Sequence, residues 1–227
     1  MNKLLIPYLE KAKACYELKE LERLGLTPDM EQRELILTFT CLILQWNEIA
    51  GLIVKAEEDN LFLRHFCDSL QPLLLFGFKK NAIILDIGAG GGFPSIPIRI
   101  FRPDLTFVLA ESSRKKTAFL KEVTKELNFE NISIYNGKVE SMDIPDRKFD
   151  YVLSRGIGSL QKFSQLAKPL ITDDGHMYTF KTKQFVSELE SITTNKDKEG
   201  VRISEIAEYD LGNQILGLNL VSLELMK

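Results

Sequence analysis

A short apolar run that ends in a cluster of glycines constrains the fold of this chain more than any other feature. Residues 82–87 (Ala-Ile-Ile-Leu-Asp-Ile) are followed by four glycines within five positions, at 88, 90, 91 and 92. A nearly continuous apolar run of this length is typical of a strand buried on both faces of a parallel sheet. Glycines directly after such a strand allow a tight turn and the close approach of a ligand to the backbone. We therefore expect a parallel sheet with a ligand-binding loop at this strand end.

Apolar runs and helical patterns alternate through the rest of the chain. Further strands are predicted at residues 105–110, 132–135, 149–154, 175–180 and 220–225. A helix is predicted between the second and third strands, with Ser112 or Ser113 as its N-cap. Because strands and helices in this order form right-handed crossovers, the sequence predicts a doubly wound α/β sheet.

The first 80 residues have a different pattern, which predicts helices. Thr27 followed by Pro28 is typical of a helix start, with Thr27 as the N-cap. Apolar residues then recur every three or four positions, which predicts a stripe that packs on a core. The stripe consists of Ile36, Phe39, Ile43, Trp46 and Ala50. With a further helix predicted at residues 61–75, we expect an N-terminal helical region (1–80) and a sheet domain (81–227).

The composition narrows the possible classes of function. The 227 residues carry 29 basic and 32 acidic side chains and a net charge of −3, so any contact with nucleic acid has to come from local clusters. The longest apolar runs are far below the ~20 residues of a membrane span, and the N-terminus lacks the features of a secretory signal. Three cysteines and two histidines without metal-ligand spacing predict buried thiols and no bound metal. These features together predict a cytoplasmic protein.

The residues around the glycines indicate which ligand the loop binds. In the dinucleotide fingerprint G-x-G-x-x-G the last position would be Phe93, and Asp86 at the strand end would repel a pyrophosphate. Asp86 favours a cationic ligand, and S-adenosylmethionine carries a sulfonium and an α-amino group. Glu111, at the end of the next strand, is placed to accept hydrogen bonds from both ribose hydroxyls. We therefore expect S-adenosylmethionine at Asp86, Gly88, Gly90 and Glu111, with a nicotinamide-dependent oxidoreductase as the alternative.

Three longer motifs include or accompany these residues. Residues 85–97 start a helix with two prolines, at 94 and 97, residues 64–70 read Arg-His-Phe-Cys-Asp-Ser-Leu, and residues 149–155 read Phe-Asp-Tyr-Val-Leu-Ser-Arg. Together they resemble the bacterial 16S ribosomal RNA guanine-N7 methyltransferases, also called the glucose-inhibited division protein B family. The resemblance implies a Rossmann-like class I S-adenosylmethionine-dependent methyltransferase sheet with an N-terminal helical extension. It also implies 16S ribosomal RNA of the small ribosomal subunit as the substrate.

The resemblance assigns further positions to the site. The cofactor contacts that it implies fall at Gly88, Phe93, Val139, Glu140 and Arg155. For contacts with the RNA substrate the chain offers Arg64, His65, Lys181 and Lys183. The chain departs from the family after Trp46, where an Asn-Leu-Thr element is usual, and at Glu111, where aspartate is usual.

The reaction that the resemblance implies needs little acid–base catalysis. Guanine N7 carries an in-plane lone pair and no proton, so the enzyme has to position the base and exclude water, and we name no catalytic base. A class I methyltransferase acting on another RNA, a small molecule or a protein would share the cofactor motifs. A non-catalytic binder of RNA or of assembling ribosomes on the same fold is a further alternative. We expect a monomer that methylates small-subunit particles faster than short RNA oligonucleotides.

Overall fold

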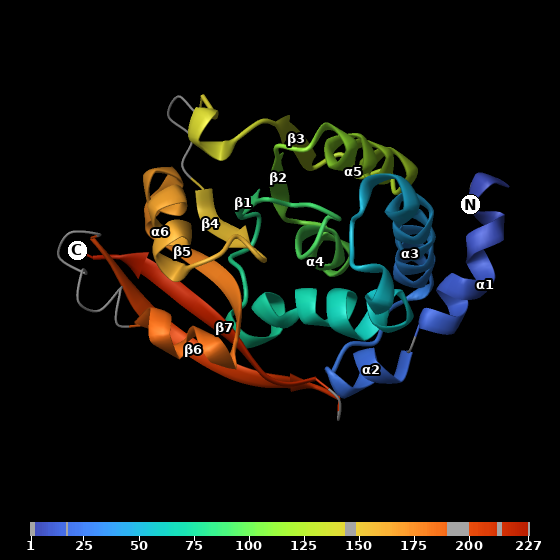
Figure 1. The fold of residues 1–227 in the computed structure, drawn as a ribbon, viewed down its shortest axis with the longest axis horizontal. Helices are drawn as coiled ribbons and strands as arrows, with labels where there is room; N and C mark the ends of the chain where they lie inside the picture. Colours follow the sequence, from blue (N-terminus) through green and yellow to red (C-terminus); the bar gives the residue numbers. More distant parts are fainter. Residues whose placement is uncertain (1–2, 17, 144–148, 190–199, 213–214, 227) are drawn as a thin grey trace.

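A single seven-stranded sheet runs through the computed structural model, which describes residues 3–16, 18–143, 149–189, 200–212 and 215–226 (Figure 1). Its strands follow the order β3-β2-β1-β4-β5-β7-β6. They are β1 (Ile83–Ile87), β2 (Thr106–Glu111), β3 (Ile132–Asn136), β4 (Phe149–Ser154), β5 (Ile171–Thr182), β6 (Val201–Leu211) and β7 (Ile215–Leu225). The first five strands pair in parallel, whereas β7 is antiparallel to both β5 and β6. The strand order reverses beside β1, so the carboxyl ends of β1 and β4 flank the position where ligands of such sheets bind.

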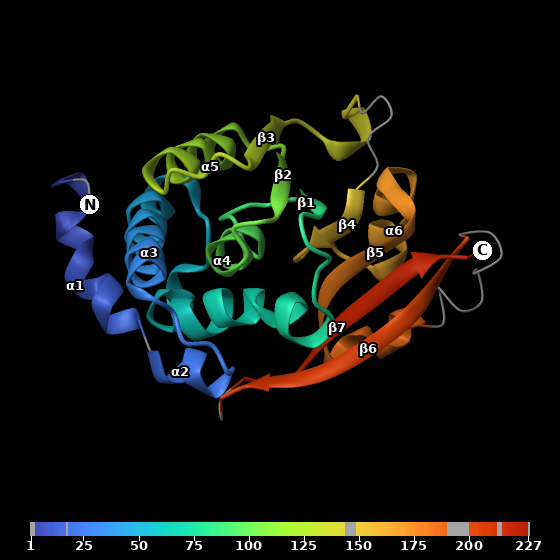
Figure 2. The same ribbon diagram turned by 180° about the vertical axis from the view of Figure 1, so that it is seen from behind.

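Helices cover both faces of the sheet. They are α1 (Ile6–Cys15), α2 (Leu18–Arg23), α3 (Met30–Ala50), α4 (Ser95–Phe101), α5 (Arg114–Glu126) and α6 (Leu160–Ala167). The two opposite views show α3, α4 and α5 grouped together and α6 apart from them (Figures 1 and 2). Phe39 of α3 and Phe119 of α5 share one core cluster with Ile84 of β1. Phe163 of α6 packs instead with Leu85, which points to the other face of β1.

The predicted strands are confirmed, and the sheet has one strand more than the sequence indicated. β5 begins at Ile171 rather than at 175, and β7 begins at Ile215 rather than at 220. β6 was not predicted. It lies at the edge of the sheet, and only Val201, Tyr209 and Leu211 of its eleven residues are buried. Its apolar alternation is interrupted at Glu205 and Ile206, beside a shift of register in its pairing with β7, so the pattern by which strands are found in a sequence is broken.

The N-terminal helices pack as the apolar stripe predicts, but the predicted start of α3 is wrong. The N-cap is Asp29 and not Thr27, and the helix begins at Met30. The Asp29 carboxylate accepts a hydrogen bond from Gln32 N at 2.8 Å, and the Gln32 side chain accepts one from Asp29 N at 3.0 Å. This reciprocal capping box satisfies two backbone donors, so it sets the helix start beyond Pro28. For α5, Ser113 is the N-cap, which decides between the two serines that the sequence left open.

The segment predicted as a helix at residues 61–75 is helical, but two stretches of it are π-helix. These are Phe62–Cys67 and Pro72–Phe76. π-turns are rare and occur often at functional sites. The first stretch carries Arg64 and His65, and Asp68 follows it directly. The irregular winding therefore coincides with the part of the helical region that lies against the glycine loop.

The helical region and the sheet share one apolar core. Leu21, Phe66 and Leu70 from the first 80 residues belong to the same cluster as Leu109 of β2 and Leu153 of β4. All three cysteines are buried, and none of them is in a disulfide. Among the described residues no helix is long and apolar enough to cross a membrane.

Candidate cofactor and substrate site

The loop after β1 forms one wall of a cavity at the carboxyl ends of the strands. Gly88 has φ +75°, and a Cβ atom placed on it would meet no atom within 4 Å, so its backbone faces open space. Gly92 has φ +80°, and a Cβ there would lie 2.6 Å from Cγ1 of Ile96. Gly88 therefore leaves room for a ligand, whereas Gly92 lets α4 start close against the loop.

The cavity, which we call the glycine-loop pocket, has a volume of about 320 Å³. It is lined by Leu52, His65, Gly88, Ala89, Gly90, Gly91, Phe93, Glu111, Lys116, Arg155 and Gly156. Five of the cofactor contacts expected from the sequence thus lie around one space. They are Gly88, Gly90, Phe93, Glu111 and Arg155. His65, expected as a substrate residue, lines the same pocket.

Glu111 holds the glycine loop in place. One carboxylate oxygen, Oε2, accepts a hydrogen bond from Gly90 N at 2.9 Å, and Oε1 accepts one from Ser113 N at 2.7 Å. The residue is only 8% exposed, yet it lines the pocket. Each carboxylate oxygen can accept more than one hydrogen bond, so Glu111 retains acceptor capacity toward a ligand.

Asp86 lies beneath the loop and is fully buried. Ser95 Oγ donates a hydrogen bond to its Oδ2 at 2.6 Å, and its Oδ1 has no partner within the described part of the chain. Burial raises the pKa of Asp86 to about 7, because the charged form loses its hydration. Asp86 does not line the pocket, and its burial favours the protonated carboxyl group more than at an exposed aspartate.

Val139 and Glu140 form a short 3-10 turn after β3, Val139–Ser141. Val139 is buried and packs in the core on the α6 face of the sheet, whereas Glu140 is exposed. Neither residue is among those that line the glycine-loop pocket. Their assignment as cofactor contacts stays a prediction.

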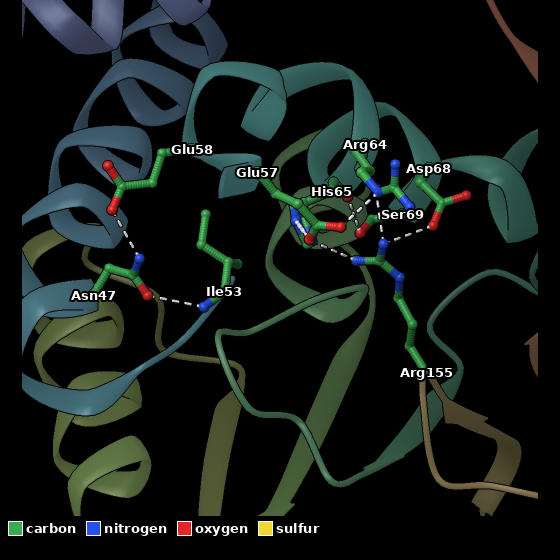
Figure 3. A network of polar contacts seen from close by, with 9 residues as sticks. All are labelled: Asn47, Ile53, Glu57, Glu58, Arg64, His65, Asp68, Ser69 and Arg155. Carbon is green, nitrogen blue, oxygen red and sulfur yellow. Dashed lines mark hydrogen bonds and ion pairs between the residues drawn. The ribbon is translucent and has the colours of Figure 1, made fainter. Parts of the chain in front are cut away.

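The Arg155 side chain extends from the end of β4 to the helical region, where it makes a network of polar contacts (Figure 3). Nη1 lies 3.0 Å from Nδ1 of His65. Nη2 donates to the backbone oxygen of Arg64 at 2.7 Å and pairs with Oδ2 of Asp68 at 3.0 Å. The motif residues of 64–70 and the arginine that ends the 149–155 motif are thus direct partners.

His65 is neutral in this network, and its tautomer follows from its neighbours. A guanidinium can only donate, so Nδ1 of His65 accepts from Arg155 and the ring proton is on Nε2. Nε2 lies 3.0 Å from Oε2 of Glu57, to which it donates, and the other oxygen of Glu57 pairs with Nε of Arg64 at 2.8 Å. Burial and the nearby Arg155 charge lower the pKa of His65 to about 4. His65 therefore connects the helical region to β4 without carrying charge.

Asn47 supports the wall of the glycine-loop pocket that carries Leu52 (Figure 3). Its side-chain oxygen accepts a hydrogen bond from Ile53 N at 2.9 Å, and its nitrogen donates to Oε1 of Glu58 at 2.9 Å. A Cβ on Gly91 would lie 3.4 Å from Cβ of Leu52, so this wall lies directly on the loop. Asn47, next to Trp46, therefore holds in place the segment in which the chain departs from the family motif.

A second cavity of about 190 Å³ adjoins Arg155, and we call it the Phe180 pocket. It is lined by Arg64, Asp68, Arg155, Phe180, Lys181, Thr182, Tyr209, Ile215 and Leu218. The guanidinium carbon of Arg155 lies 6.0 Å from the centre of the Phe180 ring. Arg155 therefore separates the two pockets and lines both.

The two lysines expected near the substrate differ in their environment. The Lys181 side chain is 7% exposed, and its ammonium donates to Oε2 of Glu188 at 2.8 Å and to the backbone oxygen of Gly158. The Lys183 side chain is 68% exposed and lies 3.9 Å from Glu208. Only Lys183 presents its charge to solvent.

Several residues of the site were not singled out from the sequence. Asp68 lies inside the 64–70 motif and Glu57 begins an acidic run, so the sequence indicated both as site residues only weakly. The sequence did not indicate Tyr209 or Phe180, because the local pattern around a strand residue does not identify the side chain that it contacts after folding. Among the described residues no group of histidine, cysteine and carboxylate side chains could hold a metal ion.

Comparisons with known proteins bear on this geometry. A family model described as rRNA small subunit methyltransferase G (GidB) matches residues 32–215. The ribosomal RNA small subunit methyltransferase G of Staphylococcus aureus is 31% identical over 182 residues, which are 79% of this chain and 76% of that protein. The protein of the same name from Chromobacterium violaceum is 35% identical over 193 residues, covering 84% of this chain and 88% of that protein.

A solved structure shares the architecture. The crystal structure of a SAM dependent methyltransferase from Aquifex aeolicus aligns with a TM-score of 0.58 at 15% identity, covering 78% of this chain and 97% of that one. This confirms the predicted class I methyltransferase fold. The family match spans the glycine loop, the Arg155 network and all of β6, and it confirms the resemblance carried by the sequence motifs. The chain belongs to the rRNA small subunit methyltransferase G family.

Proposed function

We propose that this protein methylates N7 of a guanine in 16S ribosomal RNA, with S-adenosylmethionine held in the glycine-loop pocket. The observation that carries the proposal is the meeting of Gly88, Glu111 and Arg155 around one cavity in a member of this family. The cavity lies where the strand order reverses, which is the usual ligand position in open α/β sheets.

The residues present fit this cofactor. The open space beside Gly88 admits a ligand against the backbone, and buried Asp86, which accepts a hydrogen bond from Ser95, supports the loop from beneath. Glu111 would accept from the ribose hydroxyls, Phe93 would pack against the ligand, and the Arg155 guanidinium suits a carboxylate. We place the adenine toward the turn Val139–Ser141, as the resemblance implies. When bound, S-adenosylmethionine supplies a methyl group activated by its sulfonium charge.

We place the guanine base in the Phe180 pocket, which shares Arg155 with the glycine-loop pocket. The Phe180 ring offers a surface on which a base can stack, as unpaired RNA bases do on aromatic side chains. Arg64 and Lys183 line a neighbouring cavity, which shares Arg64, Thr182, Ile215 and Leu218 with this pocket. Both side chains are at least half exposed, and we assign them to contacts with phosphates. Because N7 has no proton to lose, these residues need only orient the base and exclude water. Lys181 is occupied by Glu188, and we assign it to holding the 158 loop.

The oligomeric state of the enzyme and the form of its substrate belong to this function. We propose that the enzyme is a monomer that works in the cytoplasm on small-subunit particles. The helical region (1–80) contributes Leu52, His65 and Asp68 to the site, so we expect the sheet domain (81–227) to need it for activity.

Methyl transfer from tritiated S-adenosylmethionine tests the function. Small-subunit particles from a strain that lacks this gene are the substrate, and the labelled nucleoside is identified by chromatography and mass spectrometry. We expect label in 7-methylguanosine of 16S RNA, and none when the particles come from the parent strain, whose site is already methylated. Label in another nucleoside, or equal transfer to a short unstructured oligonucleotide, would contradict the proposal.

A further inference from the structure

The Arg155 guanidinium, placed between the two pockets, is held by a buried carboxylate that has a partner of its own. Asp68 is 5% exposed, and its Oδ2 pairs with Nη2 of Arg155 at 3.0 Å. Its Oδ1 accepts a hydrogen bond from the hydroxyl of Tyr209 at 2.6 Å. Tyr209 belongs to β6, the edge strand at the far end of the sheet from β3. A contact chain therefore runs from this edge to the end of β4.

We propose that Tyr209 is a positioning residue that acts through Asp68 to hold the Arg155 guanidinium at the boundary of the glycine-loop and Phe180 pockets. This inference rests on the proposed function, since it assumes that Arg155 contacts the ligands there. An arginine side chain has many rotamers, so its position is fixed only by partners on more than one side. His65 and the Arg64 carbonyl are two of these partners, and Asp68 is the charged partner of Arg155 among the described residues.

Asp68 can serve as that partner only while it is ionised. Burial disfavours its charged form and raises its pKa, whereas Arg155, the Tyr209 hydroxyl and Arg64 act in the opposite direction. His65, the other titratable group beside Arg155, is neutral above about pH 4 and does not compensate. Removal of the Tyr209 hydroxyl takes away a donor to the anion, so the carboxyl of Asp68 will hold its proton up to a higher pH. Arg155 then loses its charged partner over that additional range.

The decisive variant is Tyr209→Phe, which deletes one oxygen and leaves the buried ring. Its control is Tyr151→Phe, because Tyr151 is also buried on this face of the sheet and its hydroxyl also takes part in one hydrogen bond, from Lys79 N at 3.1 Å. We expect Tyr209→Phe to weaken S-adenosylhomocysteine binding about fivefold in calorimetric titration, equivalent to about 1 kcal/mol. Tyr151→Phe is expected to bind like the wild type, although both variants lower the melting temperature.

Two further measurements separate positioning from general stability. The pH at which half of the ligand affinity is lost should be about half a unit higher in Tyr209→Phe than in the wild type. In an Arg155→Ala background, Tyr209→Phe should change the affinity less than twofold, because its effect passes through the arginine. An equal loss in both backgrounds, or a Tyr209→Phe protein that matches Tyr151→Phe, would overturn the inference. A wild-type protein that binds no S-adenosylhomocysteine would instead contradict the proposed function.

Discussion

The two halves of the site are built in different ways. The glycine-loop half is built mainly from one stretch of the sequence, in which β1, the glycines and α4 follow one another. Glu111 from the next strand and Leu52 from the helical region complete it. The Arg155 half brings together Glu57 to Asp68, the end of β4, and Tyr209 near the end of the chain. In the first half the backbone makes the site, while in the second half charged and polar side chains make it through contacts with one another. A single substitution in the loop should therefore have a large effect on ligand binding. Substitutions in the network should each have a smaller effect, and these effects should depend on one another.

The largest effect is expected for Gly88→Val. A valine at φ +75° is strained, and its side chain would fill the open space of the glycine-loop pocket. We expect S-adenosylhomocysteine affinity to fall by about a hundredfold or more in calorimetric titration. Gly77→Val is the matched control, because Gly77 has φ +76° and equally open surroundings but lies outside the pocket. Both variants should lose similar stability, and equal binding by the two would remove the loop from the site.

The next effect is expected for Glu111→Ala. The change removes the acceptor for Gly90 N and Ser113 N as well as the proposed partner of the ribose hydroxyls. Charge-assisted hydrogen bonds are worth about 1.5–3 kcal/mol each, so affinity should fall about tenfold or more. Glu111→Gln keeps one acceptor oxygen and should lose less. A change below about twofold in Glu111→Ala would show that the loop holds its shape without this side chain.

A pH-dependent effect is expected for Asp86→Asn. In the folded protein the pKa of Asp86 is about 7, compared with about 4 in the unfolded chain, so between these values only the native state binds the proton. The stability of the wild type therefore falls as pH rises from about 4 to 7, whereas asparagine does not titrate. The melting temperature of Asp86→Asn relative to the wild type should rise by a few degrees between pH 5 and pH 8. A constant difference across this range would mean that Asp86 is ionised throughout.

The smallest effects on binding are expected for the two lysines. Lys181→Ala breaks the pair with Glu188 and should lower the melting temperature while leaving RNA affinity nearly unchanged. Lys183→Ala should leave the melting temperature unchanged and weaken RNA binding about twofold, with a smaller dependence on salt. Filter binding at several salt concentrations checks both. A reversal of the two outcomes would move the RNA contact to Lys181.

Local sequence patterns predicted the elements whose signal is strong within a few residues. The buried strand before the glycines, the Ser113-capped helix and β4 lie where the apolar pattern put them. The start of α3 was predicted wrongly because two cap signals stand two residues apart and only the Asp29 side chain forms the reciprocal bonds. β6 was missed because its apolar alternation breaks at Glu205 and Ile206, beside a shift of register in the pairing with β7.

The sequence by itself determined the sheet, the glycine loop and the family, because each depends on backbone conformation or on residues that are close along the chain. The tertiary structure decided which side chains meet. Only folding could show that Asp86 lies beneath the loop rather than in the pocket, and that Lys181 is paired with Glu188. It also brought Tyr209 to Asp68 across the sheet. Which side chains meet depends on the strand order of the sheet, and the energy of a charged side chain depends on how deeply it is buried. Neither leaves a local pattern in the sequence.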